Sequence, residues 1–370
     1  MSNTEKDPQE QVLPEPGYAG VGLSSGIRGG ENGVTLLEPR RVPLGGPRAM
    51  DVRRTLPQRA RSLVGAWCFL DFYGPDRVSD TGGMRVARHP HTGLATVSWL
   101  FTGRVDHIDS AGNWATVRPG DAVFMNAGRG ITHSEHSSTD TTVLHGAQLW
   151  YAFPDHNRFS EPSLDVHRPE PVHGKGWQAR VFAGSLLGIT SPLKTRAPIS
   201  GTELRLEAGT RLEIDVPESH EHALLRVEGD VRLNDTAVPI DHLAVVETGH
   251  RSLLVQAGDE PVLALLIGGE PFGEEIVMWW NFVGRTHEEI ETYRAAYQAE
   301  MGFEAPPVGS PLRELDEPLG GAIDGDPYDR LRGEHYTDGR TFPQFGTFPS
   351  GQPAPIPAPA LPTTRLRPRQ

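Results

Sequence analysis

The fold is decided by residues 89–135, which read HPHTGLATVSWLFTGRVDHIDSAGNWATVRPGDAVFMNAGRGITHSE. This stretch opens with His89-Pro90-His91 and closes with His133-Ser134-Glu135, and between them short apolar runs are separated by glycine turns. Short strands at close spacing, with turn residues between them, are typical of an antiparallel sandwich or barrel. No helical pattern of useful length interrupts the stretch. We therefore predict an all-β fold.

Similar patterns continue on both sides of this stretch. An apolar run at residues 66–73 ends at Gly74-Pro75, which predicts a buried strand stopped by a turn. Residues 101–105 (FTGRV) resemble residues 227–231 (VEGDV), each with a glycine turn after strand-like residues, so we infer a duplicated β-barrel. A polar connection at residues 161–176 separates two series of predicted strands: 95–101, 105–108, 113–117, 122–124 and 142–153, then 180–182, 203–206, 211–216, 223–227, 231–233, 243–247, 253–255 and 262–267.

The two ends of the chain differ from these series. Residues 1–34 are polar and glycine-rich without hydrophobic periodicity, which predicts a disordered lead-in. Thr286-His287-Glu288-Glu289 is a capping box that predicts a helix ending at Gly302. The 13 prolines after Gly302 predict an extended tail without its own core, which either wraps the domains or stays mobile. The expected units are a lead-in over 1–34, a barrel over 35–160, a barrel over 177–302 that ends in the helix, and a tail over 303–370.

Composition excludes several classes of protein. The 35 basic and 48 acidic residues give a net charge of −13, which leaves no overall basic field to attract nucleic acid or an anionic membrane. No uncharged apolar run reaches the roughly 18 residues that span a bilayer, and the N-terminus has no apolar signal region. The single cysteine, Cys68, rules out an internal disulfide and suits a cytoplasmic location. Phosphate-binding loops, serine elbows and zinc-finger spacings are absent from the sequence.

Two pairs of side chains in the opening stretch can share one metal ion. Residues i and i+2 of a strand point to the same face, so His89 and His91 form one pair, and His133 and Glu135 form the other. If two strands bring these pairs opposite each other, three imidazoles and one carboxylate face a common pocket. Such a set suits Fe(II), Mn, Ni, Co or Zn. We predict one metal site in the first barrel, although the four residues could instead form a buried polar cluster without metal.

Several motifs resemble the pirin family of the cupin superfamily over residues 35–302. The resemblance is specific in the first half of this range and looser in the second half. The matching motifs are His89-Pro90-His91-Thr92-Gly93, Arg118-Pro119-Gly120-Asp121, Ala127-Gly128-Arg129-Gly130-Ile131-Thr132-His133-Ser134-Glu135, Gln148-Leu149-Trp150, Gly268-Gly269-Glu270-Pro271 and His287-Glu288-Glu289-Ile290. It implies a bicupin, that is, two tandem cupin-type barrels, here with a short C-terminal helix and a Pro-rich tail. It also implies a metal, usually iron, held in the N-terminal barrel by His89, His91, His133 and Glu135.

One position departs from the pirin pattern. Pirins commonly carry a glutamate four residues after the second histidine of the first pair, whereas this chain has Ala95 there. That glutamate is the carboxylate ligand in many other cupins. Its absence leaves Glu135 as the carboxylate candidate.

The resemblance implies two alternative functions. Some pirins open the flavonol quercetin with dioxygen, which would make this chain a quercetin 2,3-dioxygenase-like oxidoreductase with a small aromatic substrate. In that case Fe(II) is the favoured metal, and Glu135 would be both a ligand and the catalytic group that moves a proton. Other pirins are regulators, so the alternative is a non-catalytic iron protein that binds a protein partner in a redox-dependent way. Direct nucleic acid binding is expected in neither case.

Other candidate residues have simpler interpretations. Asp106, His107 and Asp109 precede a hairpin turn, and turn hydrogen bonds explain them at least as well as chemistry does, so we leave them out of the site. We interpret Arg129 as a structural ion-pair partner and Trp99 as a core residue.

The second series of strands also carries a histidine pair. His220-Glu221-His222 repeats the H-x-H pattern, and His242 and His250 follow it. A second metal site is conceivable here, but no carboxylate falls at matching spacing. Surface or loop histidines are the simpler interpretation.

Overall fold

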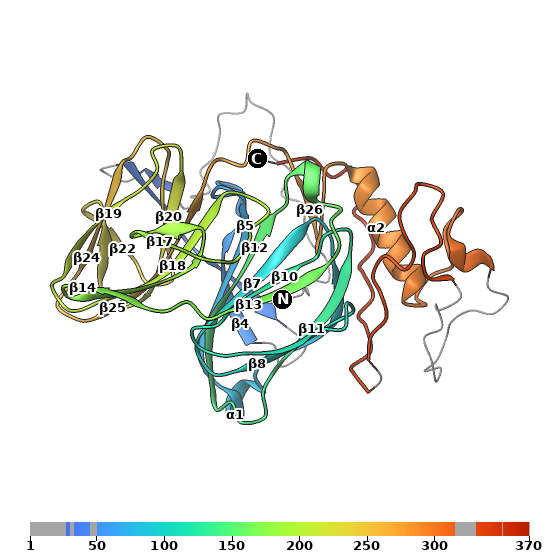
Figure 1. Ribbon diagram of the computed structural model, residues 1–370, viewed down its shortest axis with the longest axis horizontal. Helices are drawn as coiled ribbons and strands as arrows, with labels where there is room; N and C mark the ends of the chain where they lie inside the picture. Colours follow the sequence, from blue (N-terminus) through green and yellow to red (C-terminus); the bar gives the residue numbers. More distant parts are fainter. Residues whose placement is uncertain (1–26, 30–32, 45–49, 315–330, 350, 370) are drawn as a thin grey trace.

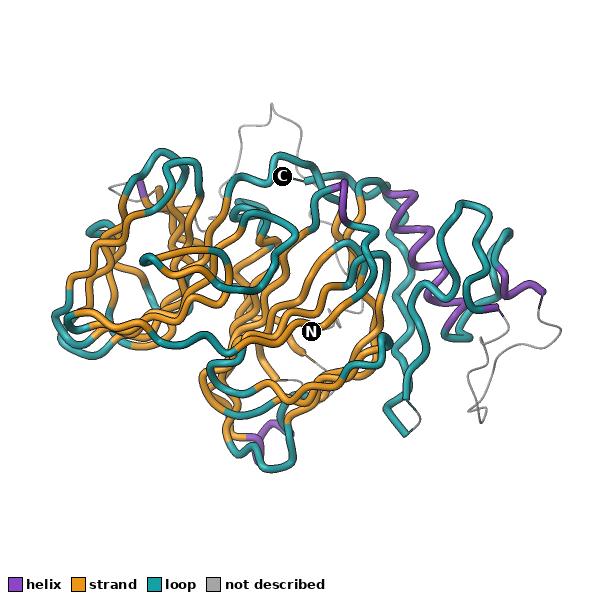
Figure 2. The backbone as a smooth tube through the Cα atoms, in the orientation of Figure 1, coloured by secondary structure: helices purple, strands orange, loops and turns teal. Residues whose placement is uncertain are grey.

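The computed structural model of the chain describes residues 27–29, 33–44, 50–314, 331–349 and 351–369. Strands dominate these residues and form two β-barrels that lie side by side, with one long helix and the C-terminal tail beyond the first barrel (Figure 1). Figure 2 shows how the remaining segments connect the strands as loops and turns. The predicted all-β fold with two tandem barrels is confirmed.

The first barrel consists of a seven-stranded and a four-stranded sheet. Its strands are β3 (Arg40–Leu44), β4 (Met50–Leu56), β5 (Trp67–Arg77), β6 (Arg85–His91), β7 (Leu94–Thr102), β8 (Val105–Asp109), β9 (Trp114–Val117), β10 (Ala122–Asn126), β11 (Ile131–Ser137), β12 (Val143–Ala152) and β13 (Ser163–His167). The order is β13-β10-β7-β12-β5-β4-β3 in the larger sheet and β6-β11-β8-β9 in the smaller one.

The second barrel repeats this plan with an eight-stranded and a four-stranded sheet. Its strands are β1 (Ile27–Gly29), β2 (Val34–Leu37), β14 (Val172–Gly174), β15 (Trp177–Ala183), β18 (Ile199–Leu206), β19 (Arg211–Asp215), β20 (Glu221–Glu228), β21 (Val231–Leu233), β22 (Thr236–Val238), β23 (Leu243–Val246), β24 (Ser252–Ala257) and β25 (Val262–Gly269). The order is β1-β2-β23-β20-β25-β18-β15-β14 and β19-β24-β21-β22.

The duplication inferred from the sequence is visible in the connections. In the first barrel β7 leaves the larger sheet and enters β8 of the smaller sheet at Gly103, and in the second barrel β20 enters β21 in the same way at Gly229. Both glycines have a positive φ, 89° and 70°. Glycine adopts this conformation without a Cβ penalty, which explains why the two matching pentapeptides share it.

The central strands of the larger first-barrel sheet are buried on both faces. The register of β12 and β7 sets Gln148 beside Ser98 and Ala147 beside Trp99. Ser98 contacts Glu135 inside the first barrel, so this face points inward. Ala147 and Trp99 instead join an apolar cluster with the second barrel, which supplies Phe182, Ile199, Leu225, Leu265 and Ile267 among others.

A hairpin and a helix follow the second barrel. The hairpin consists of β26 (Val277–Trp279) and β27 (Phe282–Gly284), and the helix is α2 (His287–Glu300). The Thr286 hydroxyl caps α2 by accepting from the Glu289 N–H at 3.2 Å, which confirms the predicted helix start. The shorter elements are α1 (Val78–Thr81), η2 (Asp155–Asn157), β16 (Ser185–Leu186), β17 (Ile189–Thr190) and η3 (Pro311–Glu314). No helix in the described ranges is both long and apolar enough to cross a bilayer.

The described part of the Pro-rich tail is packed on α2. Its buried side chains form one cluster with Ile290, Tyr293 and Tyr297 of the helix, and they are Leu312, Leu331, Tyr336, Phe342, Phe345, Ala358 and Leu366. These residues correspond to the wrapping alternative of the sequence prediction.

Three details differ from the sequence-based expectations. β5 does not stop at Gly74-Pro75 but continues to Arg77, with an irregular register against β12 that accommodates the extra residues. The connection at 161–176 contains β13, which pairs with β10, and β14, which pairs with β15. Of the expected lead-in, residues 27–29 form β1, which pairs with β2, and Val34 begins β2, whereas residues 1–26 and 30–32 lie outside the described part of the chain.

Candidate metal centre

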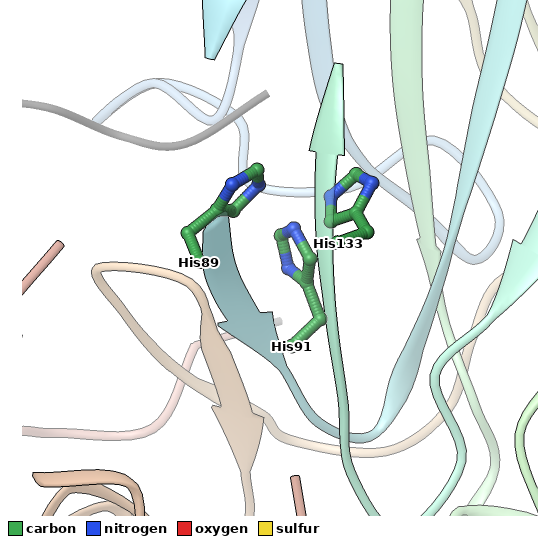
Figure 3. A group of neighbouring side chains, drawn as sticks. All are labelled: His89, His91 and His133. Atoms are coloured by element: carbon green, nitrogen blue, oxygen red, sulfur yellow. The ribbon is translucent and has the colours of Figure 1, made fainter. Parts of the chain in front are cut away.

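Strands β6 and β11 bring the predicted histidines together. The two strands pair antiparallel and set His89 directly opposite His133. Figure 3 shows the His89, His91 and His133 rings gathered between these strands. The centroid of the His133 ring lies 4.3 Å from that of His89 and 5.0 Å from that of His91. The predicted pairing of the two motifs is therefore present.

The three histidines have the properties of metal ligands. All three are fully buried, one ring nitrogen from each lies within 4.8 Å of the others, and none of the Nε2 atoms has a hydrogen-bond partner among the described residues. Burial lowers the pKa of each imidazole well below 6.5, and the neighbouring histidines lower the pKa of His91 and His133 further. A neutral imidazole with a bare nitrogen is the form that binds a metal. The donor set thus fits a divalent transition metal.

The other ring nitrogen of each histidine has a neighbour that orients the ring. His89 Nδ1 lies 2.8 Å from the Ala87 carbonyl oxygen, and His91 Nδ1 lies 3.1 Å from the Asn281 carbonyl oxygen. A carbonyl only accepts, so both rings carry their proton on Nδ1 and leave Nε2 bare. Asn281 lies between β26 and β27, so the hairpin after the second barrel helps to position a residue of the first.

Glu135 belongs to a second, overlapping group. Its carboxylate oxygen lies within 4.8 Å of ring nitrogens of His107 and His133. Ser98 Oγ donates to Glu135 Oε1 at 3.3 Å. A β-bulge between His133 and Glu135 shifts the register, so that Glu135 lies opposite Val86. The structure therefore unites three predicted ligands in one group and places Glu135 in a group that shares His133. The full four-ligand set stays a prediction.

His107 and Asp109, which the sequence analysis left out of the site, lie against it. Both are buried, and β8 pairs with β11 so that Asp109 lies opposite His133 and His107 opposite Glu135. The i, i+2 rule that selected His89 and His91 also applies to these two residues and could have found them. The sequence analysis did not assign them to the site because turn hydrogen bonds already explained them.

The wall of the first barrel next to the histidines combines aromatic and polar groups. The Trp150 ring lies 4.9 Å from His91, edge to face, and stacks on Phe69 at 3.9 Å. Gln148 Oε1 accepts a hydrogen bond from Ser98 at 2.8 Å. In the described part of the chain, neither Trp150 Nε1 nor Gln148 Nε2 has a hydrogen-bond partner. These two buried donors can bind an oxygen-bearing ligand.

The remaining candidates lie elsewhere. The rings of His220 and His222 are 6.0 Å apart and form no group of three candidate ligands within the described ranges, so a second metal site gains no support. Arg129 Nε pairs with Glu161 at 3.0 Å, which confirms its interpretation as an ion-pair partner. Trp99 stacks on Phe182 between the two barrels, which confirms its interpretation as a core residue.

Comparisons with known proteins agree with the fold. The family model Pirin matches residues 49–151, and the model Pirin C-terminal cupin domain matches residues 201–303. The chain is 37% identical to the Pseudomonas aeruginosa protein named putative quercetin 2,3-dioxygenase PA1205, over 70% of this chain and 82% of that protein. It is 31% identical to a pirin-like protein of Caulobacter vibrioides, over 71% of this chain and 92% of the relative.

A solved structure has the same architecture over most of the chain. It is the crystal structure of quercetin 2,3-dioxygenase from Acinetobacter baumannii, with a TM-score of 0.74 and 29% identity, and the match covers 90% of this chain and 96% of that one. Both cupin domains and their order are thus accounted for by one family. The chain belongs to the pirin family.

Proposed function

We propose that this pirin is a metal-dependent oxygenase of the quercetin 2,3-dioxygenase type, with one metal ion held by His89, His91, His133 and Glu135. Fe(II) is the favoured ion because the resemblance to pirins implies iron, and the same ligand set also suits Mn, Ni, Co or Zn. The observation that carries the proposal is the convergence of three buried, neutral imidazoles whose Nε2 atoms have no protein partner in the described chain. Similarity to the quercetin 2,3-dioxygenase of A. baumannii supports a small aromatic substrate.

The residues around the site suit such a substrate. When bound, the metal would supply a Lewis-acid centre next to which a flavonol and dioxygen can react. Trp150, beside His91, offers a flat apolar wall for an aromatic ring. The Gln148 amide nitrogen can donate to a substrate oxygen because the protein leaves it without an acceptor among the described residues. Glu135 would accept the proton of a flavonol hydroxyl.

Oxygen uptake with a flavonol tests the proposal. We expect the Fe(II)-loaded protein to consume one O₂ per flavonol opened and to place both oxygen atoms of ¹⁸O₂ in the products. His91→Ala removes one nitrogen ligand, so the affinity for iron should fall by more than the roughly 10–100-fold that is typical of losing an outer partner of a ligand, and turnover should be lost. His156→Ala, which changes an exposed histidine, serves as the control and should keep both.

Two outcomes would contradict the proposal. Unchanged turnover in His91→Ala would show that the reaction does not use this site. Stoichiometric iron without oxygen uptake over a panel of flavonols would favour the alternative of a non-catalytic regulator that binds a protein partner.

We also propose a cytoplasmic location, which suits a lone buried thiol, Cys68, whose pKa burial raises to about 12.

A further inference from the structure

We propose that Asp109 and His107 form a relay that fixes the tautomer of His133 and so makes its Nε2 a metal ligand. The inference rests on the proposed metal site but concerns the protein's own protons. The Nδ1 atoms of His89 and His91 each lie within hydrogen-bond distance of a backbone carbonyl oxygen. The Nδ1 of His133 instead lies 3.3 Å from the Nδ1 of His107. An imidazole nitrogen can donate or accept. His133 therefore needs a further group to decide which of its nitrogens carries the proton.

Asp109 is in position to make that decision. Its Oδ2 lies 3.3 Å from the Nε2 of His107, and the two side chains are 0% and 2% exposed. The other neighbours of the carboxylate are donors. The Ala111 and Asn113 backbone N–H groups donate to Oδ1 at 2.9 and 3.0 Å, and the Asn113 amide donates to both oxygens at 3.1 and 3.0 Å. A carboxylate in this setting acts as an acceptor only.

The proton positions follow in sequence from that carboxylate. With its proton on Nε2, where it is donated to Asp109, His107 has a lone pair on Nδ1. That lone pair accepts the Nδ1–H of His133, and the Nε2 of His133 is left bare beside the Nε2 atoms of His89 and His91. Both nitrogens of His107 are then engaged, which favours a positioning role for His107 over direct ligation. Such outer partners fix ring orientation and strengthen the ligand.

Asp109→Asn reverses the direction of the hydrogen bonds in this series, keeps nearly the same side-chain shape, and gives up one bond from the Asn113 amide. The amide oxygen stays where three N–H groups converge on Oδ1, so the amide nitrogen faces the Nε2 of His107. His107 then accepts at Nε2 and donates from Nδ1 to His133, which forces the His133 proton onto Nε2. We expect the affinity for Co(II), titrated alone into metal-free protein, to fall by about 10–100-fold.

Asp106→Asn is the matched control. Asp106 lies on the same strand and accepts from the Thr116 hydroxyl at 2.7 Å, a bond that an amide oxygen can keep. This variant should bind Co(II) as the wild type does. His107→Phe provides a second test that leaves the Asp109 turn intact, and it should weaken Co(II) binding because His133 loses its acceptor.

Imidazole ¹⁵N NMR of the metal-free protein reports which ring nitrogen of His133 carries the proton. A purely structural role of Asp109 would leave that position unchanged when Asp109 is replaced. The wild type should show His133 with its proton on Nδ1, and Asp109→Asn should show it on Nε2. Wild-type Co(II) affinity in Asp109→Asn, or a His133 tautomer that is the same in both proteins, would overturn the relay. Failure of flavonol turnover would not affect this test, since it measures protons and metal affinity only.

Discussion

His222 is a buried histidine outside the metal centre. Its side chain is 1% exposed, and neither ring nitrogen has a hydrogen-bond partner within the described ranges. Burial, and then the charges of His220 and His250, lowers its pKa from 6.5 to about 4. The folded protein therefore holds this residue neutral at pH 5, where an unfolded chain would protonate it.

This difference predicts acid destabilisation between pH 6.5 and pH 4. Between these pH values the unfolded state binds a proton at His222 that the folded state does not bind. The contribution of neutral His222 to the free energy of unfolding is therefore fully present above pH 6.5 and is lost as the pH falls towards 4. Lowering the pKa from 6.5 to about 4 corresponds to ~3 kcal/mol of unfolding free energy. His222→Leu should flatten the pH dependence of the urea midpoint over this range, whereas His173→Leu, at an exposed site, should not. Equal pH dependence in His222→Leu and the wild type would contradict the assignment.

Single residues of the site differed in how far the sequence could predict them. His89, His91 and His133 stand in short motifs whose i, i+2 spacing directly implies a shared face, and the structure gathers all three. Asp109 also occupies a turn, and its Oδ1 does make the turn hydrogen bonds expected of it. The second oxygen of the same carboxylate faces His107. Asp109 thus has two roles, and its role in the turn was by itself enough to explain an aspartate at this position.

At the level of elements, the strands with regular alternation were predicted closely. The predicted strand at 231–233 coincides with β21, and the predicted strand at 211–216 differs from β19 by one residue. β5 was predicted too short because Gly74 and Pro75 usually end strands, whereas here Gly74 has a positive φ of 76° and the strand resumes after an irregular pairing. For the tail, the sequence left wrapping and mobility as alternatives, because its apolar residues lack periodicity and are buried only where α2 meets them.

The tail connects α2 to the strands that carry the histidines. The Glu300 carboxylate at the end of α2 accepts from the backbone N–H groups of Gln344 and Phe345, both at 2.8 Å, and from the Tyr336 hydroxyl at 2.6 Å. The Phe345 carbonyl accepts from the Thr132 hydroxyl at 3.1 Å, one residue before His133. Glu300 thus anchors a segment that supports β11.

Replacing Glu300 should loosen that support. Glu300→Leu leaves three buried donors without their acceptor, so we expect a loss of about 2–5 kcal/mol in unfolding free energy, together with faster amide exchange in residues 331–349 and 131–137. Glu218→Leu is the control, because Glu218 forms an exposed pair with Arg251 that should contribute about 1 kcal/mol or less. Exchange rates in the tail that match the wild type would rule out the anchoring role.

In the whole molecule, the two barrels are joined by side chains and by the path of the chain. One apolar cluster contains residues of both barrels. Trp67 Nε1 of the first barrel donates to the Ser200 and Gly268 carbonyls of the second, each at 3.1 Å. β2 pairs with β23 of the second barrel, although β3, which follows it, belongs to the first. Separating the barrels would therefore expose core and break the hydrogen bonds of Trp67.

This connection predicts that both barrels unfold together. Calorimetry should show a single transition whose calorimetric and van't Hoff enthalpies agree. Trp67→Phe removes the indole donor from two buried carbonyls and should cost about 1–3 kcal/mol, so that the transition moves to lower temperature without splitting. Trp114→Phe changes a side chain that is 72% exposed and should leave the transition in place. Two resolved transitions in the wild-type protein would instead mean that each barrel is stable alone and that the shared cluster adds little to their cooperativity.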